Sequence, residues 1–274
     1  MNSGTDPVPR PFREIAPVAW SYHRGTCRWT HNASHPVEDW PEHPEEHLAA
    51  PYHPLPPPAA VRSPLADLLS KRFSCRVFTA EPLTFEQVAT LAAAAYGTIG
   101  HAAIGLIGLP ERPVPSGGGM YPLELYFLIR SGGAVPAGVH HYHPHAHGLE
   151  HLRDVELPAR YLTYLFMNQR WFAEAAAVVV LTGLPRRTAR KYGDRGYRYL
   201  LLEAGHIAQN LVLAAGSLGL ATCCGGGFFD DELAGLLVAD IEDEVPVYAI
   251  AVGSPAPLDR ASLRRGEASD DDSS

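Results

Sequence analysis

The segment Arg72-Phe73-Ser74-Cys75-Arg76 places two guanidinium groups on either side of a hydroxyl. Arginine donates paired, charge-assisted hydrogen bonds to anions, and serine adds a further donor. This set of residues suits a phosphate group. The same composition is also typical of a basic surface loop, which is the alternative.

Two glycine runs border predicted strands. Pro115-Ser116-Gly117-Gly118-Gly119 precedes one strand, and Gly225-Gly226-Gly227 follows another. A glycine backbone can approach a flat ligand closely and offer N–H donors without side-chain bulk. Each run alone is equally typical of a flexible loop. Together, beside two strands, they favour a planar ligand.

The pair Lys191-Tyr192 precedes the longest predicted helix. Both side chains can transfer protons when burial or neighbouring charge tunes the pKa. The pair is therefore a candidate acid–base group, with a helix-entry turn carrying a surface lysine as the alternative.

Histidines and cysteines could suggest a metal centre, but their pattern does not. Five histidines occupy one turn-containing segment with no cysteine or carboxylate cluster nearby, so we predict no metal site. Adjacent Cys223 and Cys224 rarely reach disulfide geometry. We expect reduced thiols at all four cysteines, as in a cytoplasmic protein. The residues concerned are His140, His141, His143, His145, His147, Cys27, Cys75, Cys223 and Cys224.

Hydrophobic periodicity and capping residues predict the elements that position these groups. Ser63 and Pro64 open a short helix, and Thr84 opens a second, with Gln87 as its capping-box partner and Gly97 as its end. Further helices are expected over 158–171, 195–218 and 233–237 (capped by Asp230), strands over 123–130, 139–142, 149–152, 175–182 and 245–252, and a loop over 98–122.

These elements mix without regular βαβ alternation, which predicts the α+β class. Residues 1–61 are rich in proline and histidine and read as an extended arm on the domain or on a partner subunit. Residues 62–260 form the domain, a mixed central sheet flanked by helices, and 261–274 an acidic disordered tail. In the long helix, polar His206, Gln209 and Asn210 line a cavity or an interface, or form a satisfied buried cluster.

Composition excludes several classes of protein. Charged residues make up 19% of the chain and the net charge is -8, so neither a mostly disordered chain nor a nucleic-acid binder is expected. No apolar run reaches the roughly 18 residues of a membrane span, and the start lacks an apolar signal segment. We predict a cytoplasmic protein with no membrane or nucleic-acid partner.

The order of the motifs resembles one family. KRFSCRVF, a helix ending in AAYG, RPVPSGGGMYPLELYFLIR, RKYGDRGYRYLLLEAGHIAQNL and GGFFDDELAGLL occur in succession between residues 62 and 253. This series resembles the SagB/ThcOx-type (McbC-like) dehydrogenase branch of the nitroreductase superfamily. The early YHRGT also fits that branch.

The resemblance implies a nitroreductase-like fold and an intertwined homodimer with FMN at the subunit interface. It implies that the loop with Arg72, Phe73, Ser74 and Arg76 holds the phosphate, ribityl chain and pyrimidine edge. Pro115, Ser116, Gly117 and Gly118 would approach from the partner, and Gly226 and Gly227 would lie near N5 and O4. Lys191 and Tyr192 match a catalytic pair. Many superfamily members place a phosphate-binding basic residue soon after the last strand. This chain departs from that pattern: Ser254 follows Gly253, and the next basic residues are Arg260, Arg264 and Arg265.

The branch implies oxidation of thiazoline or oxazoline rings in a modified peptide or natural-product intermediate to azoles, alongside a cyclodehydratase or similar partner. An NAD(P)H-dependent nitro or quinone reductase is the first alternative. A non-catalytic scaffold subunit of a biosynthetic complex is the second.

Overall fold

The computed structural model describes residues 17–18, 21–22, 50–104, 107–130, 132–258 and 260–265. They contain a seven-stranded sheet in the order β1-β6-β5-β4-β7-β9-β8 and a separate β2-β3 hairpin. The strands are β1 Tyr52–Pro54, β2 Gly100–Ile104, β3 Ile107–Glu111, β4 Leu123–Ile129, β5 Gly138–His143, β6 Gly148–Arg153, β7 Ala177–Gly183, β8 Ala221–Gly225 and β9 Val245–Gly253.

The named strand pairs are all antiparallel. Among the described residues, the parallel pairing is an isolated bridge between Ser74 and Thr222 at the β8 edge. The α+β class is thus confirmed, but the sheet that we expected to be mixed is antiparallel apart from this bridge.

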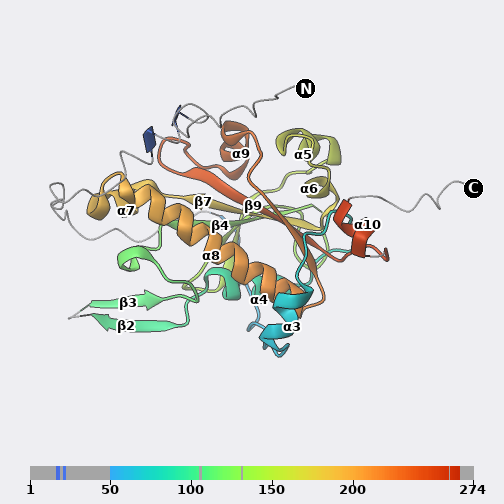
Figure 1. Ribbon diagram of the computed structural model, residues 1–274, viewed down its shortest axis with the longest axis horizontal. Helices are drawn as coiled ribbons and strands as arrows, with labels where there is room; N and C mark the ends of the chain where they lie inside the picture. Colours follow the sequence, from blue (N-terminus) through green and yellow to red (C-terminus); the bar gives the residue numbers. More distant parts are fainter. Residues whose placement is uncertain are drawn as a thin grey trace, which may run out of the picture.

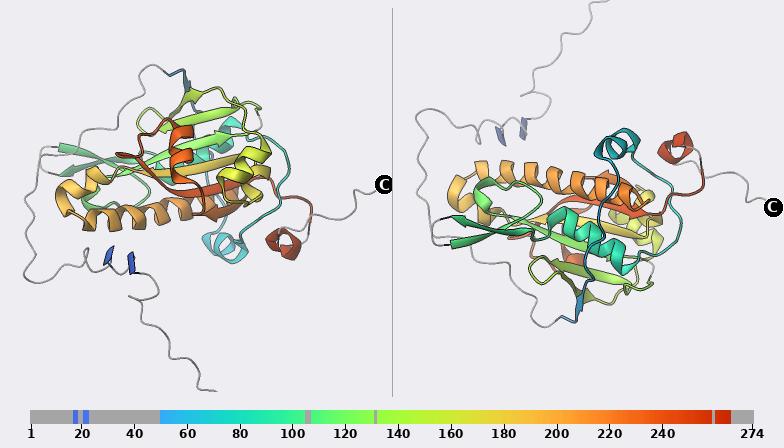
Figure 2. Two further views of the ribbon diagram at one scale, coloured as in Figure 1. Left: turned by 90° about the horizontal axis from the view of Figure 1, so that it is seen from above. Right: turned by 90° about the horizontal axis from the view of Figure 1, so that it is seen from below.

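Helices cover both faces of the sheet (Figures 1 and 2). α4 and α8 pack against one face, and α5, α6 and α9 against the other. Alternate β4 side chains enter the two cores: Leu125 and Phe127 face α4 and α8, whereas Tyr126 and Leu128 face the other side. The helices are α3 Leu65–Lys71, α4 Phe85–Tyr96, α5 Ala159–Leu165, α6 Trp171–Glu174, α7 Pro185–Tyr192, α8 Arg195–Ser217, α9 Asp230–Leu237 and α10 Arg260–Arg265, with the 3-10 turn η1 at Gly117–Gly119.

Locally encoded elements agree with the sequence. The Thr84 hydroxyl accepts a hydrogen bond from the Gln87 amide at 3.1 Å, and the Gln87 side chain accepts one from the Thr84 amide at 2.9 Å. This capping box opens α4, which ends at Gly97. The long helix α8 ends just before Gly219, which has a φ of +73°.

Other expected boundaries were wrong. The predicted loop 98–122 contains the β2-β3 hairpin, and the predicted helix 158–171 is two short helices. Met167 and Asn168, with φ of +52° and +64°, interrupt the helical path between α5 and α6. Pro64 and Phe229, rather than Ser63 and Asp230, are the N-cap residues of α3 and α9.

The two ends of the chain are described only in part. Most of the N-terminal arm, including Trp20, Trp29 and Trp40, lies outside the described residues. Of the arm, the Tyr22 ring packs edge-to-face on Tyr197 of α8, with centroids 6.0 Å apart. Further along the arm, β1 pairs with β6 at the edge of the sheet. At the other end of the chain, α10 extends into the segment that we expected to be a disordered tail.

Within the part of the chain that the structure describes, no helix is both long and apolar enough to cross a bilayer.

Candidate functional site

The loop after β3 brings Gly118 against the end of α7. A Cβ atom built on Gly118 would lie 2.6 Å from Tyr192 Oη and 3.0 Å from Lys191 Nζ. The φ of Gly118 is +69°, which side-chain-bearing residues rarely adopt. The backbone conformation therefore favours glycine here, and a larger residue would also displace the ends of the Lys191 and Tyr192 side chains. The structure brings together two segments that the sequence singled out separately.

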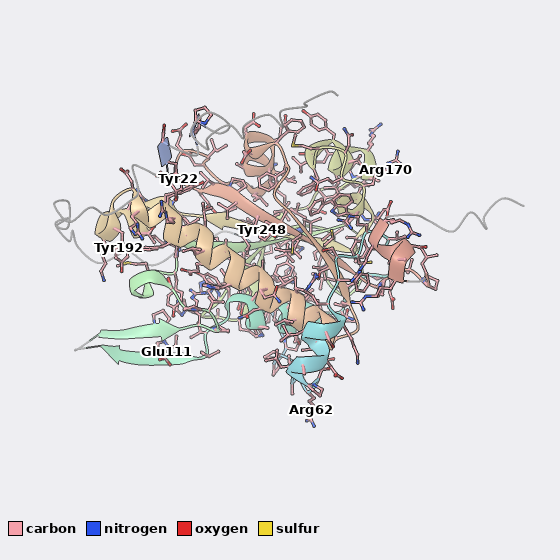
Figure 3. All side chains as sticks on the ribbon, in the orientation of Figure 1. Tyr22, Arg62, Glu111, Arg170, Tyr192 and Tyr248 are labelled. Atoms are coloured by element: carbon pink, nitrogen blue, oxygen red, sulfur yellow. The ribbon has the colours of Figure 1, made fainter. Side chains whose placement is uncertain are left out.

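Lys191 and Tyr192 end a helix that the sequence did not reveal. The sequence placed them just before the long helix, and the structure shows that they form the last turn of α7, which stops at Gly193 with a φ of +56°. Figure 3 shows Tyr192 at the end of the molecule where α7 meets α8. The Lys191 ammonium lies 5.5 Å from the centre of the Tyr192 ring.

Tyr199 on α8 packs against both the glycine run and Tyr192. Its ring packs edge-to-face on Tyr192, with centroids 4.9 Å apart, and a Cβ on Gly117 would lie 3.4 Å from it. Arg195 Nε donates a hydrogen bond to Tyr199 Oη at 3.0 Å. We call Gly117, Gly118, Lys191, Tyr192 and Tyr199 the Lys–Tyr half-site.

The loop Arg72–Arg76 lies at the edge of the sheet beside β8. The Cys75 amide donates to the Thr222 carbonyl at 2.9 Å, and the Arg76 amide donates to the Leu263 carbonyl of α10 at 2.8 Å. These bonds fix the loop between β8 and α10.

Two basic residues of α10 contact this loop. Arg260 Nη2 donates to the carbonyls of Lys71 and Arg72 at 2.7 and 3.2 Å. The Arg260 and Arg264 guanidiniums lie 5.0 and 5.8 Å from the centre of the Phe73 ring. Of the basic residues that follow Gly253, Arg260 and Arg264 thus lie against the loop. We call Arg72–Arg76 with these two arginines the arginine half-site.

Arg76 takes a particular orientation within this half-site. Its Nη1 hydrogen-bonds the Arg264 carbonyl, and its guanidinium lies 5.3 Å from the centre of the Trp171 ring. Behind Arg72 and Phe73 lies a cavity of about 340 Å³ between α3 and α8. Clustered guanidiniums, a hydroxyl and an adjoining cavity fit a ligand that carries a phosphate group.

The glycines after β8 lie further along the same edge strand. Gln169 Nε2 donates to the Gly227 carbonyl at 2.7 Å, and a Cβ on Gly227 would lie 2.8 Å from that nitrogen. A Cβ on Gly226 would meet nothing within 4 Å. Thr222 touches the arginine half-site, and Gly226 is four residues on, about 13 Å along an extended strand. Open space at Gly226 and a phosphate-binding loop at that separation fit an elongated, phosphorylated ring system.

The two half-sites lie at opposite ends of α8. Gly117 contacts Tyr199, whereas the cavity beside Arg72 is lined by Val212 and Gly216. The 1.5 Å rise per helical residue separates Tyr199 from Gly216 by about 25 Å. One chain alone therefore does not bring the half-sites together.

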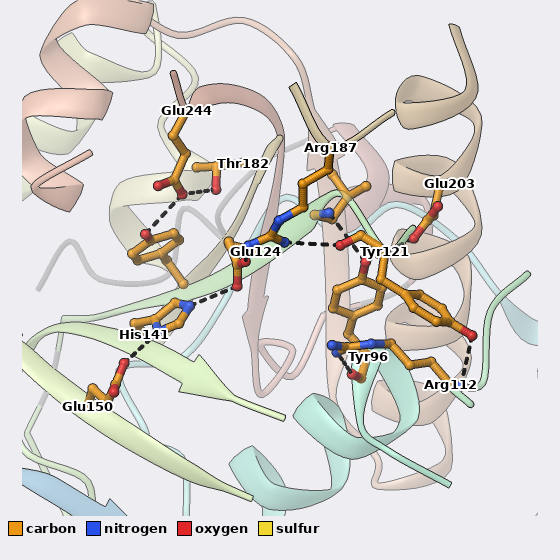
Figure 4. Close-up of polar contacts among 12 residues, drawn as sticks. Tyr96, Arg112, Tyr121, Glu124, His141, Glu150, Thr182, Arg187, Glu203 and Glu244 are labelled. Atoms are coloured by element: carbon orange, nitrogen blue, oxygen red, sulfur yellow. Dashed lines mark hydrogen bonds and ion pairs between the residues drawn. The ribbon is translucent and has the colours of Figure 1, made fainter. Parts of the chain in front are cut away.

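A buried polar network holds α7 on the sheet (Figure 4). Arg187 Nη2 lies 2.8 Å from Glu124 on β4, and His141 on β5 lies between Glu124 and Glu150, at 3.0 and 2.6 Å. Burial alone would raise the pKa of Glu124, but Arg187 and His141 together lower it to about 2. Burial opposes protonation of His141, but the two carboxylates raise its pKa to about 9.

The histidine-rich segment is thus built into the sheet, with carboxylates that the sequence did not place beside it. His140 stacks on His151 with ring centroids 4.5 Å apart. Among the described residues, no group of three or more histidine, cysteine or acidic side chains could hold a metal ion. Cys75, Cys223 and Cys224 are free thiols.

Several residues around the Lys–Tyr half-site escaped the sequence reasoning. Tyr199, Glu203 and Arg112 are the main ones. Glu203 occupies a buried position of α8 between Leu200 and Ile207, and a carboxylate in that apolar stripe was a signal of a specific polar contact. The polar residues that we did single out lie elsewhere: His206 and Gln209 are exposed, and Asn210 donates to the Pro113 carbonyl at 3.4 Å.

The chain is similar to known proteins in sequence. Residues 69–254 match the model of the Nitroreductase family. "Putative nitroreductase MJ1384" of Methanocaldococcus jannaschii is 36% identical over 189 residues, which cover 69% of this chain and 90% of that protein. "Microcin B17-processing protein McbC" of Escherichia coli is 28% identical over 144 residues, which cover 51% of this chain and 53% of McbC.

Solved structures share the fold. A "putative nitroreductase" from Anabaena variabilis superposes with a TM-score of 0.68 at 22% identity. The match covers 85% of this chain and 45% of that one. The E. coli microcin synthetase McbBCD complex contains a chain with a TM-score of 0.55 at 19% identity, covering 92% and 84%. Since the family model spans more than half of the sequence, this chain belongs to the Nitroreductase family of oxidoreductases.

Proposed function

We propose that this protein is an FMN-dependent dehydrogenase that oxidises thiazoline or oxazoline rings of a modified peptide or related natural-product intermediate to azoles. The observation that carries the proposal is the contact of Gly118 with Lys191 and Tyr192. It joins a backbone suited to a flat ring with two groups that can accept or donate a proton. The catalytic roles of Lys191 and Tyr192 are part of the proposal.

The active form in this proposal is a homodimer. The outward face of α8 presents Leu201 and Leu202 to solvent, and Leu65 and Leu69 of α3 are exposed too. Exposed apolar side chains in such number favour a subunit interface. A two-fold axis across α8 would place the Lys–Tyr half-site of one chain beside the arginine half-site of its partner, because the helices would run antiparallel.

FMN is the cofactor that this combined site would hold. Arg72, Ser74 and Arg76, with Arg260 or Arg264, would bind the phosphate and polar chain beside Phe73. Gly226 and Gly227 would lie along the ring edge, and the partner's Pro115–Gly118 run would approach the ring. When bound, the flavin supplies the hydride-accepting chemistry. The protein's own task is to orient the substrate ring and to take its proton on Lys191 or Tyr192.

A peptide substrate is supported by two relatives. McbC is named for processing of microcin B17, and TfxB of Rhizobium leguminosarum, 31% identical over 114 residues, for processing of trifolitoxin. The proposal therefore includes a partner that makes the azoline, such as a cyclodehydratase.

A second candidate function is reduction of nitro compounds or quinones with NAD(P)H. It is favoured by the 36% identity to the archaeal relative, 90% of which is covered. The two functions share fold and cofactor and differ in whether the substrate gives hydride to the flavin or takes it.

The visible spectrum of the purified protein, with and without added FMN, tests the cofactor. A colourless protein that takes up no FMN would refute both functions and favour the scaffold role. If flavin binds, oxidation of azoline-containing peptides is compared with NADPH-driven reduction of a nitroaromatic compound, and turnover of the latter alone would favour the second candidate.

The Lys191→Ala variant tests the proposed base. It should abolish azoline oxidation and keep the bound flavin. Arg186→Ala is the matched control, because it removes a positive charge from the exposed side of the same helix. Retained oxidation in Lys191→Ala would remove the catalytic assignment of Lys191 and leave the cofactor assignment standing.

A further inference from the structure

The run that carries Gly117 and Gly118 is held by buried polar contacts behind it (Figure 4). Ser116 Oγ accepts a hydrogen bond from the Tyr121 amide at 2.9 Å, and Tyr121 Oη accepts one from the Arg112 amide at 3.3 Å. Arg112 Nη1 donates to the Tyr96 carbonyl at 2.7 Å. These bonds tie the run to the end of α4.

Tyr96 passes the connection on to Glu203. Its hydroxyl donates to Glu203 Oε1 at 2.9 Å and accepts from the Leu123 amide at 3.3 Å. Leu123 is the first residue of β4, just beyond the run. Tyr96 and Glu203 are each 2% exposed. A single carboxylate on α8 thus anchors both the start of β4 and the tyrosine on which Arg112 is fixed.

Side chains from four segments face the Glu203 carboxylate. These are Tyr96 from α4, Ser116 from the run, Arg112 from the segment after β3 and Arg187 from α7. Burial raises the pKa of Glu203 to about 7, although the hydrogen bond from Tyr96 and the nearby Ser116 hydroxyl act in the opposite direction. The Arg112 guanidinium also lies 4.2 and 5.0 Å from the centres of the Tyr96 and Tyr121 rings.

The backbone of the run needs such support. Gly118 and Gly119 have φ of +69°, and Tyr121, which carries a side chain, has a φ of +44°. A side-chain-bearing residue in that region persists only when the surrounding structure holds it there. Four of these hydrogen bonds end on the segment from Arg112 to Leu123, and the fifth joins Tyr96 to Glu203.

We infer that Glu203 is a positioning residue: through its hydrogen bond with Tyr96 it fixes the backbone of residues 116–121, and so sets Gly118 against Lys191 and Tyr192. The use made of this geometry rests on the proposed function. The positioning itself is a property of the protein without cofactor or substrate.

Hydrogen–deuterium exchange of the full chain without added FMN tests the inference. In Glu203→Ala, amides 116–121 should exchange about tenfold faster than in the wild type, because a buried hydrogen-bond acceptor is lost. Glu203→Gln keeps an oxygen that accepts from Tyr96 and should restore most of the protection. Unchanged exchange of residues 116–121 in a folded Glu203→Ala protein would overturn the inference.

Tyr96→Phe tests it with a smaller change, should Glu203→Ala fail to fold. It removes only the hydroxyl that joins Glu203 to Leu123. Tyr126→Phe is the matched control, because it removes an equally buried hydroxyl that bonds Glu244. Faster exchange of 116–121 in Tyr96→Phe alone supports the inference, and equal exchange in both variants refutes it. Because no flavin is used, failure of the proposed function would leave this result unaffected.

Discussion

Arg187 and Glu124 form a nearly buried ion pair, 2.8 Å apart, with 13% and 8% of the two side chains exposed. The pair joins α7 to the central strand β4, and Arg187 Nη1 also donates to the Tyr121 carbonyl at 3.1 Å. One guanidinium therefore positions both the helix that ends in Lys191-Tyr192 and the glycine run that faces this pair.

Replacing Arg187 should destabilise the fold strongly. In Arg187→Ala, Glu124 keeps His141 but loses its strongest cation, and breaking a buried pair typically costs about 3–5 kcal/mol. Denaturant unfolding followed by circular dichroism measures the loss. Arg186→Ala, which removes an exposed pair with Asp243, should cost under about 1 kcal/mol. Equal losses in the two variants would contradict the structural role given to Arg187.

The pH dependence of stability should report the charge on His141. Its pKa is about 9 in the folded protein against an ordinary value of 6.5, so the folded state binds the proton more tightly. The resulting stabilisation is fully present below pH 6.5 and is lost as the pH rises through 9; its size is on the order of 3 kcal/mol. The opposite holds for Glu124, whose contribution is lost as the pH falls towards 2.

Unfolding free energies of the wild type and His141→Gln, compared at pH 6 and pH 10, test this. The difference between the two proteins should shrink at pH 10, because the wild-type imidazole is then neutral. A difference that stays constant across that range would show that His141 is not charged in the folded protein.

Gly118→Ala should disturb the Lys–Tyr half-site directly. The added methyl group would overlap Tyr192 Oη, and the φ of +69° disfavours alanine, so we expect a loss of about 1–3 kcal/mol and lower turnover. Gly235→Ala in α9 is the control, because its Cβ meets nothing within 4 Å and alanine favours helix. Thermal unfolding and turnover measure the two effects. Wild-type stability and turnover in Gly118→Ala would show that the contact with Tyr192 is not required.

Capping residues and hydrophobic periodicity predicted the helices whose signals lie within a single segment of the sequence. The Thr84–Gln87 capping box lies within one helical turn, and the apolar stripe of α8 repeats over many turns, so both were predictable. The β2-β3 hairpin was not, because it depends on pairing Gly100 with Glu111 across a glycine-rich segment that reads as a loop. The positive φ values of Met167 and Asn168 likewise could not be predicted from hydrophobic periodicity.

The site was predictable only segment by segment. The sequence identified Gly118, Lys191 and Arg72 as separate candidates, yet Gly118 meets Lys191 through tertiary packing, in which the contact of Arg187 with Glu124 joins α7 to β4. Such a long-range pair of charges follows from strand order, which residue types alone do not determine. From the sequence, Arg260 was one of three basic residues that could lie near the Arg72–Arg76 loop. The position of α10 in the fold places Arg260 against Phe73.

The dimer proposed here predicts that subunit contact and flavin binding are lost together. Leu201 on the outer face of α8 is 40% exposed, and Leu201→Glu would place a charge in the proposed interface. Ile241→Glu, at a position 38% exposed in the turn after α9, is the matched control. Light scattering after size exclusion and fluorescence titration with FMN should show a monomer without flavin for Leu201→Glu and an unchanged dimer for Ile241→Glu. If the Leu201→Glu monomer still bound FMN as tightly as the wild type, the arginine half-site would suffice alone and the partner's Ser116–Gly118 run would have no part in holding the cofactor.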